Sequence, residues 1–132
     1  MAETINLQDC GITLLARATV HMQTADGAQT VYTVPAGKKA IVTSVVIRNP
    51  TGSLAGGTDF NLGDGANCDT WLANLNLSTM TAITDYWRST QDNAKQSSKI
   101  FDAGDAFGIK PDTGSTGDYD AIMEVFGYEF VA

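Results

Sequence analysis

The stretch DFNLGDGANCD is rich in oxygen-donating side chains, which are Asp59, Asn61, Asp64, Asn67 and Asp69. Calcium takes about six to eight oxygen ligands from a flexible loop. The order is not that of an EF-hand, because Gly63 and Asp64 stand at the fifth and sixth loop positions and no Glu closes the loop. Asp, Asn and Gly also form turns for purely local reasons. We therefore expect an ordinary loop, and the sequence leaves cation binding there open.

Thiol and imidazole groups are few: Cys10, Cys68 and His21. A zinc site would need a fourth ligand, and no C-x-x-C spacing is present. A bridge between Cys10 and Cys68 is conceivable but is not implied by their spacing. In a reducing compartment we expect two free thiols.

Nucleophilic catalysis would have to use His21, since it is the only imidazole. A hydroxyl–histidine–carboxylate arrangement meets only in space, but the sequence contains no G-x-S-x-G nucleophile elbow. The Gly-rich GSLAGG lacks the Lys-Ser/Thr of a phosphate loop. Nothing in the chain demands a reaction or a cofactor, so we expect a protein that is not an enzyme.

Aromatic side chains offer a second kind of chemistry, because sugars stack on exposed rings. The candidates are Trp71, Trp87, Tyr86 and Tyr119. Aromatic residues in a β-sandwich more often belong to the core or to an interface. Carbohydrate binding is therefore a minority interpretation.

Charge and length narrow the class of protein further. The 132 residues fit one domain, and the net charge of −7 disfavours binding to nucleic-acid backbones or anionic membranes. The N-terminus has Glu3 before any apolar stretch, which is not the pattern of a secretory signal. No apolar run approaches the roughly 18 residues of a membrane span. We expect synthesis in a cytoplasm and no contact with nucleic acid or membrane.

Short alternating segments separated by turn residues must position these groups. Period-two alternation begins after Gly11 and recurs in AIVTSVVIRN (residues 40–49) and in the closing YDAIMEVFGYEFV (residues 119–131), which we expect to be a central strand. Shorter strands are expected at residues 30–34, 57–62, 71–77, 81–88, 99–101 and 107–109. The pattern predicts an all-β antiparallel β-sandwich of jelly-roll type with about eight strands.

The predicted core draws on the alternating strands and on the last strand, which carries apolar residues on both faces. It comprises Ile12, Leu14, Ile41, Val45, Ile47, Phe107, Ile109, Val125 and Phe126. A solvent-facing corner at residues 35–39 is expected to feed the long strand, with Gly37 in a conformation that a β-branched residue resists.

Two parts of the sequence resemble a known class of proteins. YTVPAGKKAIVTSVVIRN, followed by FDAGDAFGIKP and AIMEVFGYEF, is similar to small structural proteins of tailed bacteriophages. The resemblance implies a β-sandwich that acts as a capsid decoration (cement) protein on the major capsid protein, in the virion. Head-fibre, tail or baseplate adhesion modules that bind a host carbohydrate are the alternative that it leaves open.

Residues 1–10, MAETINLQDC, are too polar to pack on a core of their own. Ile5 and Leu7 are spaced as one face of an extended segment, which typically gains order on a partner's sheet edge or groove. We expect residues 1–10 to form an arm that binds a neighbouring subunit or the major capsid protein, ahead of one domain at residues 11–132. Closed symmetry is common among small subunits, and a homotrimer suits a capsid.

Overall fold

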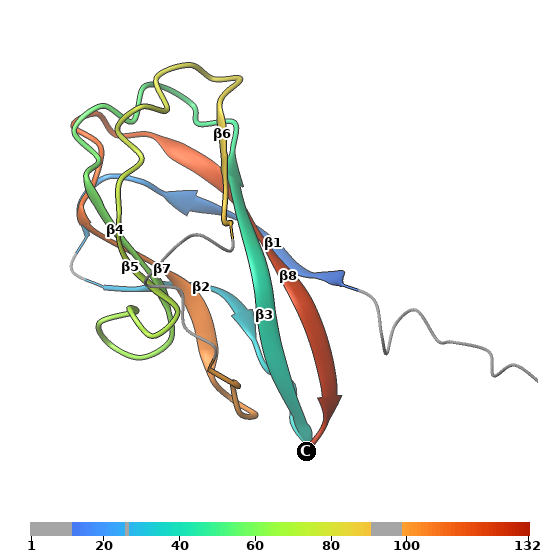
Figure 1. Ribbon diagram of the computed structural model, residues 1–132. Helices are drawn as coiled ribbons and strands as arrows, with labels where there is room; N and C mark the ends of the chain where they lie inside the picture. Colours follow the sequence, from blue (N-terminus) through green and yellow to red (C-terminus); the bar gives the residue numbers. More distant parts are fainter. Residues whose placement is uncertain (1–11, 26, 91–98) are drawn as a thin grey trace, which may run out of the picture.

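The computed structural model describes residues 12–25, 27–90 and 99–132. The arm residues Ile5 and Leu7, together with Cys10, lie outside this range. In the described residues, eight strands form two four-stranded antiparallel sheets that pack against each other (Figure 1). The described part of the chain has no helix with the length and hydropathy that crossing a bilayer requires. The prediction of an all-β antiparallel sandwich is confirmed.

The first sheet contains, in spatial order, β1 (Thr13–His21), β8 (Asp120–Val131), β3 (Lys38–Arg48) and β6 (Tyr86–Arg88). The second contains β2 (Gln29–Thr33), β7 (Ala106–Thr113), β4 (Asp59–Gly63) and β5 (Leu72–Leu75). Except for β4 and β5, consecutive strands lie in opposite sheets. This order, 1-8-3-6 over 2-7-4-5, is the arrangement of an eight-stranded jelly roll.

The two turn motifs of the phage-like segments form one unit. Gly37 has φ 76° where the Lys38 N–H bonds to the Pro35 carbonyl at 3.2 Å. Gly104 has φ 88° in the second corner, residues 102–105. The two corners are hydrogen bonded to each other, because Gly104 N–H donates to the Val34 carbonyl at 2.9 Å and Val34 N–H donates to Asp105 at 3.0 Å. The expected conformation of Gly37 is confirmed.

Large side chains from both sheets fill the space between them. Trp71 packs edge-on against Phe107 at 5.7 Å, and Phe107 packs edge-on against Phe101 at 5.4 Å between ring centroids. The Trp71 indole N–H donates to the Val42 carbonyl at 3.1 Å. The ring therefore fills the core and its N–H has a hydrogen-bond partner in β3.

Part of the predicted core is confirmed and part is wrong. Val45, Ile47, Phe107, Ile109 and Val125 are buried. Ile12 and Leu14 are instead 62% and 44% exposed, and Ile41 and Phe126 are only half-buried on the outer face of the first sheet, the face turned away from the second sheet.

Two β-bulges explain the errors at Leu14 and Ile41, whereas Phe126 faces outward because its neighbour Val125 on β8 is buried in the core. The pairing of β1 with β8 skips Leu15, and the pairing of β3 with β8 skips Thr43. An extra residue on one strand reverses which face the residues beyond it occupy. Leu14 and Ile41 consequently lie on the outer face, although strict alternation places them inside.

Three expected strands are clearly shorter than predicted. The strand expected at residues 71–77 spans only Leu72–Leu75. Of residues 81–88 only Tyr86–Arg88 pairs, with the far end of β3. Of residues 99–101 only Phe101 forms an isolated bridge, to Ala40. The central position of the last strand is confirmed, since β8 lies between β1 and β3.

Gly127 of β8 pairs with Thr13 of β1 and Val42 of β3, and it packs closely against the backbone of β3. A Cβ on this residue would lie 2.0 Å from the Ile41 carbonyl oxygen. We expect Gly127→Ala to lower the free energy of unfolding by about 2–3 kcal/mol, since backbone must move to admit a methyl group. Denaturant melts measure this, with Gly27→Ala as control because a Cβ there meets nothing within 4 Å. Equal midpoints for the two variants would contradict the close packing.

A substitution at Gly37 measures backbone strain rather than steric overlap, because a Cβ there has no neighbour within 4 Å. Its positive φ alone penalises a β-branched side chain. We expect Gly37→Val to destabilise the protein by about 1–3 kcal/mol. Thermal unfolding of Gly37→Val beside Gly37→Asn is the measurement, with a smaller effect for Asn because it tolerates this region. A Val variant as stable as the parent would disprove the strain.

Candidate interaction surfaces

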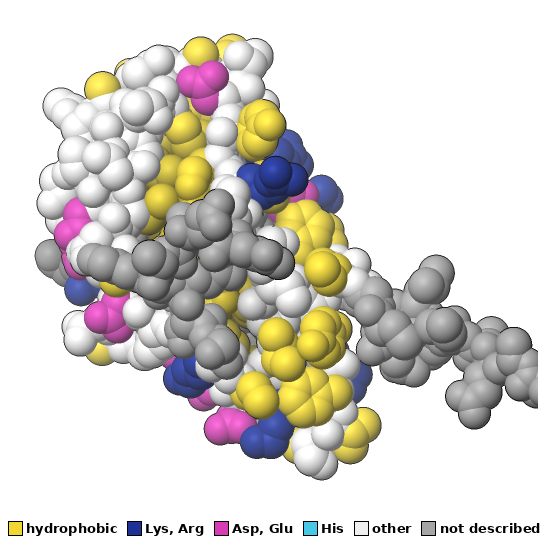
Figure 2. All heavy atoms as spheres, viewed as in Figure 1, with side chains coloured by type: hydrophobic (Ala, Val, Ile, Leu, Met, Phe, Trp, Pro, Cys, Tyr) yellow, Lys and Arg dark blue, Asp and Glu magenta, His cyan; other side chains and the backbone are white. Residues whose placement is uncertain are grey.

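Apolar side chains gather on the outer face of the first sheet, at the end where β3 begins and β8 finishes. We call this the outer-face patch, formed by Leu14, Ile41, Phe126, Tyr128 and Phe130. Alternate residues of β8 share the face, and the register places Leu14 opposite Phe126 and Ile41 opposite Tyr128. Figure 2 shows hydrophobic side chains gathered over this end of β3 and β8. Among the described strands, those of the second sheet lie on the opposite face of the first sheet and do not cover the patch.

Both β-bulges help to build the patch. Leu15 and Thr43 lie on strands either side of β8, and each bulge is next to the residue paired with Phe126. Bulges often re-aim side chains at functional edges of sheets. Here they turn Leu14 and Ile41 outward beside the aromatic residues of β8.

The other half of the outer face is charged. Glu124 accepts from Arg48 Nε at 2.7 Å and lies 3.6 Å from Arg17 Nη1. A hollow of about 180 Å³ lies beside this group, lined by Arg17, Ala18, Thr19 and Ile122. Small-molecule sites usually occupy about 300–1,000 Å³. The hollow is therefore too small to indicate a substrate site.

A second exposed apolar feature is a tip at the opposite end of β3. Ile83 is 62% exposed and Tyr86 is 69% exposed. The turn below them is held firmly, since the Asp85 carboxylate accepts from Ala82 N–H at 2.9 Å and Asn49 Nδ2 donates to the Ile83 carbonyl at 3.2 Å. The tip is thus a pre-shaped projection (the β6 end in Figure 1).

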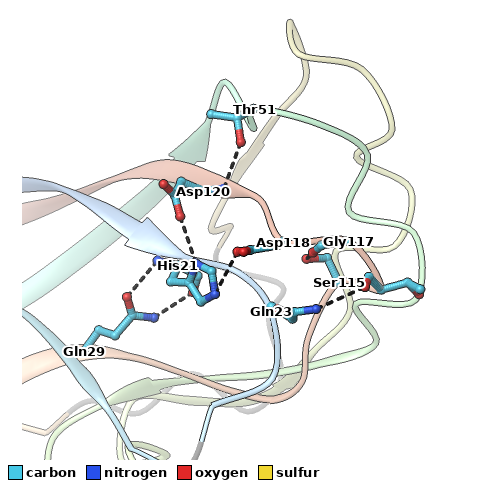
Figure 3. A network of polar contacts seen from close by, with 9 residues as sticks. His21, Gln23, Gln29, Thr51, Ser115, Gly117, Asp118 and Asp120 are labelled. Atoms are coloured by element: carbon cyan, nitrogen blue, oxygen red, sulfur yellow. Dashed lines mark hydrogen bonds and ion pairs between the residues drawn. The ribbon is translucent and has the colours of Figure 1, made fainter.

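His21 lies in a polar cluster that joins the end of β1 to the start of β8 (Figure 3). Its Nδ1 is 3.0 Å from Asp120 and its Nε2 is 3.2 Å from Asp118. The Gln29 side chain bonds both the backbone N–H and the carbonyl of His21, each at 2.7 Å. Both ring nitrogens face carboxylates, so neither is placed to take a proton from a hydroxyl or thiol. The cluster fastens an edge strand rather than assembling a catalytic triad.

The oxygen-donating side chains of residues 59–69 do not gather around one point. Asp64 is held by two Lys99 contacts at 2.9 Å and by Thr70, while Asn61 donates to Asp112 at 2.6 Å. The Asp59 Oδ1 atom is buried without a hydrogen-bond partner. One such oxygen falls far short of calcium's needs. Within the described residues, no group of three His, Cys, Asp or Glu side chains could hold a metal ion.

Cys68 is a free, buried thiol in the same loop, with its sulfur 3.3 Å from the Gly63 carbonyl. Burial raises the pKa of this thiol to about 11. A thiol of this kind is chemically inert at neutral pH. Cys10 lies outside the described residues.

The four aromatic residues considered for sugar stacking do not form one surface. Trp71 is buried, and Trp87 and Tyr119 pack against the core, which leaves Tyr86 as the exposed ring. The outer-face patch was missed by strict alternation, yet a signal was present. Even-numbered positions 126–130 of the last strand are all aromatic, although one face of that strand already supplies the core.

Comparison with protein-family models and with curated proteins finds no match. Among solved structures, the chain is similar to a chain of the capsid asymmetric unit of cyanophage Pam1, with a TM-score of 0.54 and 13% identity over 89% of this chain and 85% of that one. It is also similar to a chain of the acid-stable capsid of Helicobacter pylori bacteriophage KHP30, with a TM-score of 0.52 and 12% identity over 92% of this chain and 98% of that one. The fold is therefore one found in phage capsids, the class of particle that the sequence resemblance indicated.

Asp64 gives the loop a pH dependence that can be measured. Burial acts to raise its pKa, but hydrogen bonds from Thr70 and Lys99 and the Lys99 charge outweigh burial and hold the pKa below the ordinary value of 3.8. The ionised form therefore stabilises the fold above that value, and its contribution is lost as the pH falls through the lower folded-state pKa. We expect Asp64→Asn to lower stability at neutral pH, with a difference from the parent that shrinks in acid.

Denaturant melts over a pH series test this expectation. Thr70→Val removes one hydrogen bond to the carboxylate and should reduce the same pH-dependent difference. Parallel stability curves for parent and Asp64→Asn at every pH would contradict it.

Proposed function

We propose that this chain is a phage virion structural protein that decorates the outside of the capsid as a cement protein and stabilises the major capsid lattice. The observation that carries the proposal is the shared fold with chains of two phage capsids, matched over 85% and 98% of those chains. Because nearly all of each chain is matched, those neighbours are single small sandwiches of similar length. A subunit of this size and shape thus has a precedent as a whole capsid component.

Charge favours the outer surface of the shell over the inner one. The chain carries a net charge of −7, and the inner surface faces packaged DNA, which repels an acidic protein. The exposed apolar features are suited to binding rather than to catalysis. They are the tip at Ile83 and Tyr86 and the outer-face patch. A homotrimer remains our preferred assembly, since closed cyclic symmetry suits subunits seated on local three-fold positions of a shell.

An adhesion module of a head fibre, tail or baseplate is the competing function. It would need a receptor-binding groove, and the aromatic residues that could have stacked on sugars are mostly buried. Tyr86 alone is a weak platform, because stacking sites typically combine a ring with convergent polar groups. This arrangement favours cement over adhesion.

The proposal is tested on virions of the phage that encodes the chain. We expect mass spectrometry to find the chain in purified particles at a copy number comparable to that of the major capsid protein, and electron microscopy to find it on the outer shell. Particles made without it should assemble but release DNA at a lower temperature than the parent particles.

Added purified protein should restore the thermal resistance of the deficient particles. A substitution in the tip, Ile83→Ser with Tyr86→Ser, should restore less if the tip contacts the lattice, and Ile100→Ser is a matched control at another exposed apolar position. A few copies confined to a tail or fibre would support the adhesion module instead. Absence from the virion would overturn both functions.

A further inference from the structure

We propose that the outer-face patch is the docking site for residues 1–10 of a neighbouring copy of this chain, with Ile5 and Leu7 packed on it. This inference concerns contact between copies and does not rest on the virion role. It also names the surface that receives the arm, which the sequence alone does not.

The patch has the composition of a binding surface. It joins two aliphatic side chains with two Phe and one Tyr on a single sheet face, where antiparallel sheets in solution normally show polar residues. Aromatic residues are enriched in interface cores, and charged residues are depleted there. The other half of the same face is polar by contrast, because Glu124 forms ion pairs there with Arg17 and Arg48.

The described chain begins beside this patch. Ile12 is 62% exposed and directly precedes β1, whose first pair is Thr13 with Gly127. β8 continues beyond that pair, and residues 128–131 bond to β3 on one side with no described strand on the other. The edge of β8 beside the patch is therefore where the described residues of the chain begin, and an extended segment can bind such an edge through main-chain hydrogen bonds.

The register of β1 against β8 bears on whether the chain's own arm or a neighbour's arm reaches the patch. Thr13 lies opposite Gly127, so continuing β1 backwards would bring Asp9 opposite Val131, where β8 ends against the start of β3. Ile5 and Leu7 would then lie beyond the end of their own sheet. A segment that runs past the end of its own sheet in this way can reach the patch of a second molecule.

The arm matches the patch in the spacing of its apolar residues, and it is long enough to reach the patch of a neighbouring copy. Alternate residues of a strand are about 6.6–6.8 Å apart, so Ile5 and Leu7 match the separation of Phe126 and Tyr128. Eleven extended residues reach about 36 Å, enough to leave one small subunit and cross the face of another. Lys38 and Lys39 lie where β3 begins, but each already pairs with a carboxylate, Glu129 at 3.4 Å and Asp102 at 2.6 Å. The match therefore rests on spacing and reach.

Cross-linking between two differently labelled full-length proteins tests the proposal. Both carry Cys10→Ser, one adds Leu7→Cys and is isotopically labelled, and the other adds Ile41→Cys. With copper–phenanthroline as oxidant, we expect a mixed disulfide-linked dimer, at a yield at least tenfold above that of a control pair in which Val46→Cys replaces Ile41→Cys. Val46 lies on the same face of β3 but beyond the bulge, opposite Glu124. Cys68 does not compete because it is buried.

Two other outcomes would overturn the proposal. Equal yields with Ile41→Cys and Val46→Cys would show random collision. A disulfide formed only within one molecule of a Leu7→Cys/Ile41→Cys double variant would show that the arm folds onto its own patch. As a second measurement, Phe126→Thr should weaken self-association at least tenfold in sedimentation, and Ile122→Thr, on the other half of the face, should not. Unchanged association of a folded Phe126→Thr protein, checked by circular dichroism, would also refute it.

Discussion

The structure depends on β8, which is bonded along both of its edges. It pairs with β1 on one side and with β3 on the other, and these two pairings account for most of the first sheet. Since side chains alternate along a strand, one set of β8 residues must fill the core and the other must face outward. Ala121, Met123 and Val125 supply the core, so Phe126 and the aromatic residues after it have no place inside. The outer-face patch is thus a consequence of making a central strand apolar on both faces.

The two sheets are hydrogen bonded to each other near their ends, and the interior between them is apolar. The corner at Gly37 bonds to the corner at Gly104, and the Gln29 side chain bonds the edge of β1 at His21. Between these ties the interior is filled by aromatic rings. Of the polar side chains, Gln29 joins the second sheet to the first at His21, while the His21 and Asp64 side chains are held by ion-pair partners nearby.

The sequence was sufficient for the fold class because turn chemistry and alternation agree. Pro-Ala-Gly and Ala-Gly-Asp mark corners that the structure contains, and β-branched density marks β3. It was insufficient where a bulge intervenes. Neither Leu15 nor Thr43 is unusual in type, and the extra residue follows from pairing with a distant strand, which local periodicity does not record. The faces of Leu14 and Ile41 were misassigned for this reason, and the patch that they help to form was missed with them.

Function follows the same division between local and non-local information. A catalytic site would require convergence of reactive groups, whereas a docking surface requires only a contiguous apolar face and an open strand edge. The bulged sheet supplies both at the end of β8, next to Ile12, where the described residues begin. A subunit with an acidic body and an apolar docking face can attach to its neighbours while its net charge keeps the free protein soluble. The proposed position on a capsid lattice is compatible with this combination, because apolar contacts would then form where the lattice brings copies together.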